Sequence, residues 1–235
     1  MNCSINLGRV AGLLYLSLIP LGIFGILYVP QVLIVETDAF KTANNIAASE
    51  FIFRLSILSA FLVQIINIAV VLVLYKVLSP IHKTFAKLMV LFIFIGVPIA
   101  MLNELNHMAV LLLLDTTFVD ATEVLSNTQT STLILFFLNL HESGIYIASV
   151  FWGLWLFPMA YLVYRSNYIP KIIGILLFIA SFGYVIDTVI FFLFPSIDLV
   201  LSEYTFIGEV VFPLWLLIKG SKSKDEVLAL IHNSH

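Results

Sequence analysis

The chain has 235 residues, of which 61% are hydrophobic and only 11% are charged, and its mean hydropathy is +1.10. Soluble domains carry about 25% charged residues, so this composition excludes an ordinary soluble domain and indicates a surface that contacts lipid. The net charge of −3, without a basic tract, argues against a nucleic-acid partner. The single cysteine, Cys3, excludes a disulfide within the chain.

Six apolar stretches are long enough to cross a bilayer as helices, which takes about 20 residues. They cover about 10–32, 51–78, 85–114, 132–164, 172–194 and 204–218. The first superficially resembles a signal peptide, but it is long, lacks a small-residue cleavage motif and precedes five similar stretches, so we interpret it as a span. We therefore predict an all-α integral membrane bundle of six transmembrane helices over 1–219, followed by a short cytoplasmic tail over 220–235.

The distribution of Lys and Arg predicts the orientation of this bundle. If the spans alternate in direction, nine of the 11 basic residues fall on one side, namely Arg9, Lys76, Lys83, Lys87, Arg165, Lys171, Lys219, Lys222 and Lys224. The opposite loops carry Glu36, Asp38, Asp115, Asp120, Glu123, Asp198 and Glu203. Because positively charged loops stay in the cytoplasm, we predict a multi-pass inner-membrane protein with both termini cytoplasmic. The longer outer segments, about 35–50 and 115–131, are expected to carry short surface helices.

Polar and ionisable side chains gather in the outer halves of five of the six predicted spans. Such groups are costly in hydrocarbon and usually face the interior of a bundle. Alternating topology brings them to a similar depth, so we predict a polar chamber that opens to the outer side and receives a small polar or amphiphilic ligand. The candidate chamber residues are Glu50, Arg54, Asn106, His107, His141, Glu142, Asp187 and Glu209.

Histidines and carboxylates among these residues raise the possibility of a zinc site, because zinc accepts both ligand types. The metal ligands considered are His107, His141 and Asp187, with Glu104 or Glu142 as further carboxylates. The alternative is that the histidines only hydrogen-bond and hold helices together. Since neighbouring residues point about 100° apart on a helix, His141 and Glu142 cannot both face one centre.

For two other acidic residues, a purely structural role is an alternative to ligand binding. Glu50 and Arg54 are four residues apart and are expected to form an ion pair along one helix rather than a ligand clamp. Asp187 is either a buried partner for a basic side chain or a binding group. The sequence contains no glycine-rich phosphate loop, nucleophile elbow, H-E-x-x-H or C-x-x-C motif, so no nucleotide-driven pump is indicated and no catalytic residue is assigned.

Several stretches resemble a known family over nearly the whole chain. They are GRVAGLLYL at 8–16, NIAASEFIFRL at 45–55, and a long region from His141 to Asp187 that includes FWGLWLFP at 151–158, PKIIGIL at 170–176 and GYVID at 183–187. The chain resembles the bacterial multipass membrane family catalogued as domain of unknown function 4386. The resemblance implies a bacterial six-span protein and names no activity.

Three functions fit these features. The favoured one is a membrane protein that binds or transports a small ligand, with membrane lipids as its other partners. The second is a metal-dependent membrane hydrolase, and the third is a non-catalytic accessory protein whose polar residues serve helix association alone. The sequence leaves the choice between enzyme and non-enzyme open.

Overall fold

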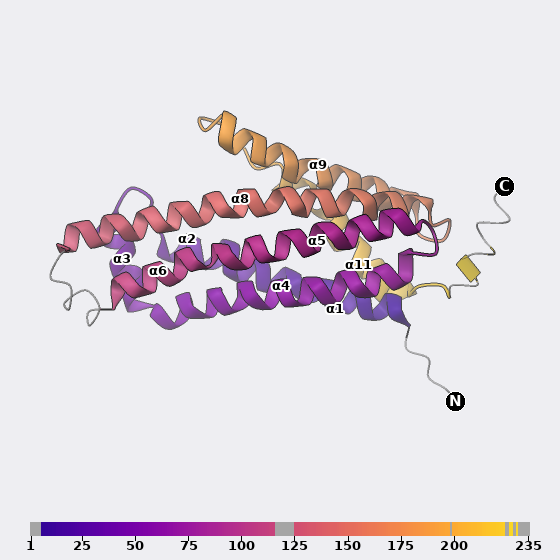
Figure 1. Ribbon diagram of the computed structural model, residues 1–235, viewed down its shortest axis with the longest axis horizontal. Helices are drawn as coiled ribbons and strands as arrows, with labels where there is room; N and C mark the ends of the chain where they lie inside the picture. Colours follow the sequence, from indigo (N-terminus) through magenta and orange to yellow (C-terminus); the bar gives the residue numbers. More distant parts are fainter. Residues whose placement is uncertain (1–5, 116–124, 198, 224–225, 228, 230–235) are drawn as a thin grey trace. The chain divides into compact units, whose positions relative to one another are not determined.

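A computed structural model describes residues 6–115, 125–197, 199–223, 226, 227 and 229. The secondary-structure elements of these residues are helices (Figure 1). They are α1 (Leu7–Gly22), the π-helix η1 (Ile23–Tyr28), α2 (Val29–Leu33), α3 (Ala39–Ala48), α4 (Glu50–Leu78), α5 (Lys83–Asn103), α6 (Leu105–Leu114), α8 (Asn127–Arg165), α9 (Lys171–Leu193), α10 (Ser202–Thr205) and α11 (Ile207–Lys219). This confirms the all-α prediction. Cys3, Asp120, Glu123, Asp198 and Lys224 lie outside the described residues.

Five segments of the described chain are long and apolar enough to cross a membrane. They are Leu7–Leu33, Glu50–Leu78, Lys83–Leu114, Asn127–Arg165 and Lys171–Leu193. Their bounds lie within five residues of the first five predicted spans. The sixth predicted span, 204–218, is divided between the short α10 and the 13-residue α11.

Large apolar side chains point outward along these helices. Leu13 is 62% exposed, Phe182 56% and Leu193 67%. Soluble proteins rarely leave extended apolar surface in water, and a lipid-facing helix needs such a surface. The exposed apolar side chains and the five long apolar segments together identify a membrane protein.

The described helices form two compact units. Unit 1 comprises Met1–Leu18, Ile65–Val97 and Tyr146–His235, and unit 2 comprises Ile19–Gln64 and Pro98–Ile145. Helices α1, α4, α5 and α8 each contribute residues to both units.

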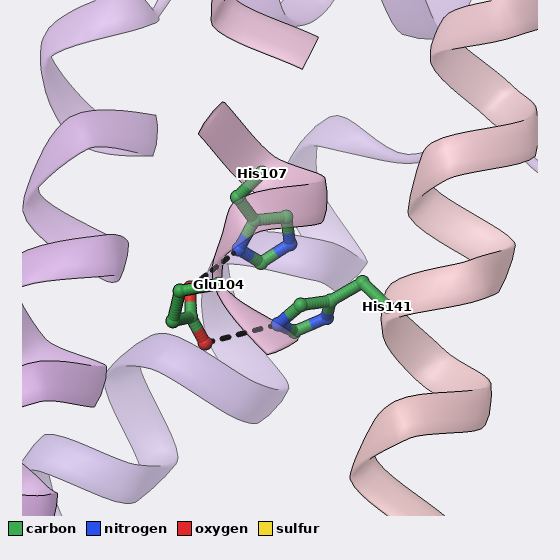
Figure 2. A group of neighbouring side chains, drawn as sticks. All are labelled: Glu104, His107 and His141. Carbon is green, nitrogen blue, oxygen red and sulfur yellow. Dashed lines mark hydrogen bonds and ion pairs between the residues drawn. The ribbon is translucent and has the colours of Figure 1, made fainter. Parts of the chain in front are cut away.

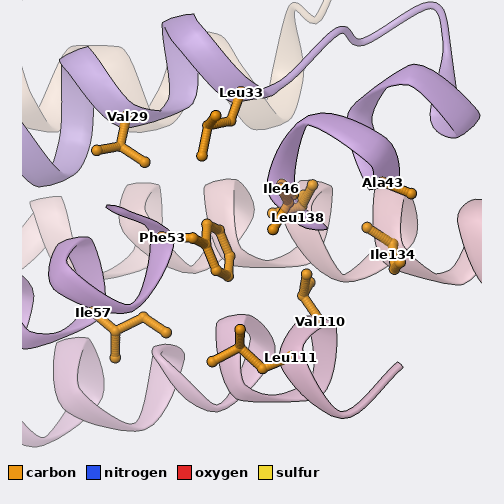
Figure 3. Close-up of a cluster of buried hydrophobic side chains, with 10 residues drawn as sticks. All are labelled: Val29, Leu33, Ala43, Ile46, Phe53, Ile57, Val110, Leu111, Ile134 and Leu138. Carbon is orange, nitrogen blue, oxygen red and sulfur yellow. The ribbon is translucent and has the colours of Figure 1, made fainter. Parts of the chain in front are cut away.

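Unit 2 has a buried apolar core to which α2, α3, α4, α6 and α8 contribute (Figure 3). Its residues are Val29, Leu33, Ala43, Ile46, Phe53, Ile57, Val110, Leu111, Ile134 and Leu138. The short helix α3 falls within 35–50, where a surface helix was expected, and most of the second such segment, 115–131, lies outside the described residues. Helix α3 begins at an Asp38 side chain that accepts the Lys41 N–H at 2.9 Å, as an N-cap does, and it turns Ala43 and Ile46 into the core.

Unit 1 is packed through close helix approaches at glycines. Gly208 of α11 lies so near α9 that a Cβ there would be 2.7 Å from the Leu176 carbonyl carbon. Gly12 of α1 lies equally near α11, because its Cβ would be 2.6 Å from the Pro213 carbonyl oxygen. Small residues allow this contact between membrane helices. The buried side chains of unit 1 include Val70, Leu74, Met89, Leu156, Met159, Leu162, Leu177, Phe212 and Leu216.

The start of α1 and the end of α11 are joined in unit 1. The Asn6 side chain donates to the Ser221 carbonyl oxygen at 3.0 Å and accepts the Ser221 N–H at 2.8 Å. The Gly8 N–H donates to the Ser221 hydroxyl at 3.0 Å. The N-terminal end of α1 and the C-terminal end of α11 therefore lie side by side.

The close approach at Gly12 leads to a test of packing by substitution. Gly12→Ala is expected to destabilise the protein by about 1–3 kcal/mol, because the added methyl group meets backbone atoms that cannot move aside. Gly22→Ala is the control, because nothing lies within 4 Å of a Cβ at that position. There the better helix propensity of Ala is expected to leave stability unchanged or raise it by up to about 1 kcal/mol. Thermal unfolding in one detergent measures both variants, and equal stabilities would contradict the packing described.

Candidate metal centre

Three buried side chains of unit 2 converge on one point (Figure 2). They are Glu104, His107 and His141, and each offers a ligand atom within 4.8 Å of the other two. His107 Nδ1 lies 2.9 Å from Glu104 Oε2, and His141 Nε2 lies 3.0 Å from Glu104 Oε1. The exposed fractions of the three residues are 6%, 6% and 9%, so the cluster is shielded from the surroundings of the protein.

Local sequence explains why two members of the cluster face the same way. Glu104 and His107 are three residues apart, a spacing that places side chains on one side of a helix. Glu104 occupies the junction between α5 and α6, where its N–H bonds to the Met101 carbonyl oxygen at 3.3 Å instead of to the residue four positions back. This tighter turn lies six residues after Pro98. Helix α5 itself continues through Pro98.

The third member comes from α8, and its ring stacks on that of His107. The two imidazole centroids are 3.5 Å apart with 24° between the ring planes. Phe53 packs edge-on against His107 with centroids 5.0 Å apart. Two helices thus bring their imidazole rings into contact beside Glu104, and neutral imidazole is the form that binds a metal.

The donor set fits a transition metal. Two histidines and one glutamate are the protein ligands of a common class of catalytic zinc site, and two histidines with a carboxylate also hold non-haem iron. In a tetrahedral zinc site with bonds of about 2.0–2.1 Å, neighbouring ligand atoms are about 3.3 Å apart. The two nitrogen–oxygen contacts, at 2.9 and 3.0 Å, run to different oxygens of Glu104, and one ligand atom from each residue lies within 4.8 Å of the other two.

A polar contact next to the cluster sets the position of α8. The Asn103 side chain donates to the His141 carbonyl oxygen at 2.8 Å, and the Asn106 side chain donates to the Asn103 carboxamide oxygen at 3.0 Å. Gly144 makes room for this contact, because a Cβ there would overlap the Asn103 carboxamide. The absence of a side chain at Gly144 therefore allows α8 to lie where His141 reaches Glu104.

The structure brings together two of the three metal ligands considered from sequence. His107 and His141 meet at Glu104, which the sequence analysis treated only as a further carboxylate. Asp187 belongs to unit 1, where its two oxygens accept the N–H groups of Leu201 at 2.6 Å and Ser202 at 2.8 Å. The signal for Glu104 was present in the sequence as the Glu-x-x-His spacing, which puts both side chains on one helix face.

The other predicted chamber residues divide between the two units. Asp187 and Glu209 belong to unit 1, and the remaining six belong to unit 2. The predicted pair Arg54–Glu50 is confirmed, with Nε 2.6 Å from Oε1 and both side chains about half exposed. Glu142 is exposed while His141 is buried, as the helical geometry requires.

Comparison with known proteins extends the resemblance but adds no activity. A family model described as "Domain of unknown function (DUF4386)" matches residues 10–220. An uncharacterized protein of Archaeoglobus fulgidus is 33% identical over 172 residues, which cover 73% of this chain and 88% of the relative. No solved structure matches the chain.

The contact between Asn103 and Gly144 predicts non-additive substitutions. Gly144→Ala is expected to cost about 1–3 kcal/mol of stability through overpacking, because its methyl group overlaps the Asn103 carboxamide. Asn103→Ala removes that overlap, so Gly144→Ala should cost less in the double variant. A double-mutant cycle by thermal unfolding is expected to give a coupling energy of about 0.5 kcal/mol or more. Additive effects would show that the two positions do not oppose each other.

Proposed function

Because the chain belongs to the DUF4386 family, whose description names no activity, we propose a function from the geometry of unit 2: a multi-pass membrane protein that binds one divalent transition-metal ion. The observation that carries the proposal is the convergence of Glu104, His107 and His141, three buried donors within 4.8 Å of one another.

A purely structural role explains this arrangement less well. The hydrogen bond from His141 to Glu104 joins two helices, and it would serve helix association by itself. His107 lies three residues from Glu104 on the same segment, so its bond to that carboxylate links no further helix. A second imidazole turned toward the same carboxylate is what a metal site requires.

Zinc is the ion that these ligands favour. Imidazole nitrogen and carboxylate oxygen together suit zinc and related first-row metals, whereas magnesium and calcium prefer sites built from oxygen atoms. The apolar ring of Phe53 on one side of His107 would limit the access of water, and an apolar shell strengthens the electrostatic interactions of a bound ion.

A metal-dependent hydrolase is the second candidate, and the number of ligands favours it. Catalytic zinc sites use three protein ligands and keep a fourth position for water, whose pKa the ion lowers to about 7. In that case His107, His141 and Glu104 would hold the ion, which would supply the activation of water for hydrolysis of an ester or amide in an amphiphilic substrate. The binding or transport of a small ligand, favoured from sequence, has no such feature among the described residues to support it.

Metal content is the direct test. We expect about one zinc per chain in the wild type, because three ligands converge on one position, and a loss of most of it in His107→Ala, His141→Ala and Glu104→Gln. Elemental analysis of protein purified without a histidine tag and without chelators measures this content. Glu142→Gln is the matched control, since it changes the exposed residue next to His141 and should retain the metal.

Folding must be checked beside the metal content. Each variant is compared with the wild type by its elution on size exclusion and by thermal unfolding. A wild type that binds no zinc, iron or manganese even after incubation with the ions would exclude the metal site and leave helix association as the role of the cluster.

We also propose that the chain crosses the membrane six times and that both its ends lie on one side. The contacts between Asn6 and Ser221 support this topology, because five crossings would put these residues on opposite faces. The sixth crossing would be residues 202–219, which extend about 27 Å as a helix against a hydrocarbon core of about 30 Å. The clustering of basic residues assigns this side to the cytoplasm, and the bacterial inner membrane remains the proposed location.

Thiol labelling tests the six crossings. In a Cys3→Ser background, Thr37→Cys is expected to react with an impermeant thiol reagent in intact cells, whereas Lys222→Cys should react only after permeabilisation. The reason is that residues 37 and 222 would then lie on opposite sides of the membrane. Native Cys3 should behave like Lys222→Cys, and opposite behaviour of these two would require an odd number of crossings.

A further inference from the structure

A partly buried carboxylate of unit 1 is held by hydrogen bonds from two other helices. Glu209 of α11 is held by the phenols of Tyr15 from α1 and Tyr184 from α9. The Tyr15 hydroxyl lies 3.0 Å from Glu209 Oε2, and the Tyr184 hydroxyl lies 2.8 Å from Oε1. Tyr15 is only 4% exposed. Three helices therefore meet at one acidic group.

The groups around this carboxylate are aromatic rather than cationic. Helix α8 contributes two indole rings, with Trp155 at 5.7 Å from Tyr15 and Trp152 at 6.1 Å from Tyr184, between ring centroids. The ionisable side chains in contact with Glu209 are the two tyrosines, and Asp187 lies three residues beyond Tyr184 on α9. Glu203 on α10 is exposed. None of the ion pairs in the described part of the chain involves Glu209.

In the same unit, the Asp187 carboxylate is stabilised by a different set of hydrogen-bond donors. Its two oxygens accept backbone N–H groups at 2.6 and 2.8 Å, and charge-assisted bonds of this kind stabilise the ionised form. Glu209 has two phenols and neither backbone N–H groups nor a cation as side-chain partners among the described contacts. A negative charge in apolar surroundings without a cation is costly. These conditions favour the neutral form of Glu209.

We propose that Glu209, Tyr15 and Tyr184 form a proton-binding site and that the Glu209 carboxyl keeps its proton in the folded protein at pH values where a free glutamate has lost it. The protonated carboxyl donates its O–H to one phenol oxygen and accepts the O–H of the other phenol. When the proton leaves to water, both phenols donate to the carboxylate. The two oxygen–oxygen contacts thus serve both states, and the tyrosines hold the carboxyl in place during the exchange.

Release of the proton would place a negative charge on Glu209, close to the contact between α1 and α11. Gly12 and Pro213 lie in backbone contact three residues before Tyr15 and four residues after Glu209, respectively. A charged Glu209 draws water or a cation toward this contact, so binding of the proton favours the closed packing. The site therefore couples the proton to the association of these two helices.

This coupling has a defined sign. In the unfolded chain a glutamate loses its proton at about pH 4.3, as it does in model peptides. Above that pH the folded protein, with Glu209 still protonated, binds more protons than the unfolded chain. Stability therefore falls as the pH rises, until the folded carboxyl also ionises.

Infrared spectroscopy in detergent or liposomes at pH 5, above the range in which a free glutamate loses its proton, tests the protonation state. The wild type is expected to show the carbonyl stretch of a protonated carboxylic acid, and this band should shift on transfer to deuterated water. The band should be absent in Glu209→Gln and present in the control Glu203→Gln, which changes an exposed residue. Identical spectra for the wild type and Glu209→Gln in this region would overturn the proposal, because Glu209 would then be ionised.

Two further measurements extend the test, and the first of them does not need Glu209→Gln to fold. Tyr184→Phe retains the carboxyl and removes one hydrogen-bond partner, so the frequency of the band is expected to change, and an unchanged band would overturn the proposal. Thermal unfolding at pH 5 and pH 8 is the second measurement. The melting temperature of the wild type is expected to fall between these values by more than that of Glu209→Gln, and an equal decrease would contradict the coupling.

Discussion

Hydrocarbon offers no hydrogen-bond partner, so each polar group on a membrane helix needs a partner within the protein. Three carboxylates of this chain meet that requirement in different ways. Glu104 faces two imidazoles, Glu209 faces two phenols, and Asp187 accepts two backbone N–H groups. The chemical character of each site follows from these partners: the first has the donors of a metal ligand set, the second has exchangeable protons, and the third is a fixed structural bond.

Close packing at glycines makes these pairings possible. Without a side chain at Gly144, the Asn103 carboxamide reaches the His141 backbone. Gly12 similarly admits the backbone of α11 beside α1 in the unit where Tyr15 meets Glu209. Apolar side chains contribute less to specificity in lipid than in water, because they find equally apolar contacts with the lipid tails. Polar pairs and small residues therefore carry much of the information about which helices touch.

The two sites give a family without a known activity two independent chemical hypotheses. The donors at Glu104 point to a divalent metal, and the phenols at Glu209 point to a proton. One site belongs to unit 2 and the other to unit 1, so the substitutions that remove one leave the residues of the other in place. Each hypothesis is consequently decided by measurements on its own unit.

Composition and local spacing were enough to predict five long apolar helices, the pair Glu50–Arg54 and the different directions of His141 and Glu142. Each of these depends on hydropathy or on neighbours within one helix. Only the tertiary structure paired Glu104 with His141, 37 residues away, and Tyr15 with Glu209, 194 residues away. It also turned Asp187 toward backbone N–H groups instead of histidines. The reason is that contacts between helices in lipid depend on the register and close approach of the two helices, which leave no periodic signal in the hydropathy of either.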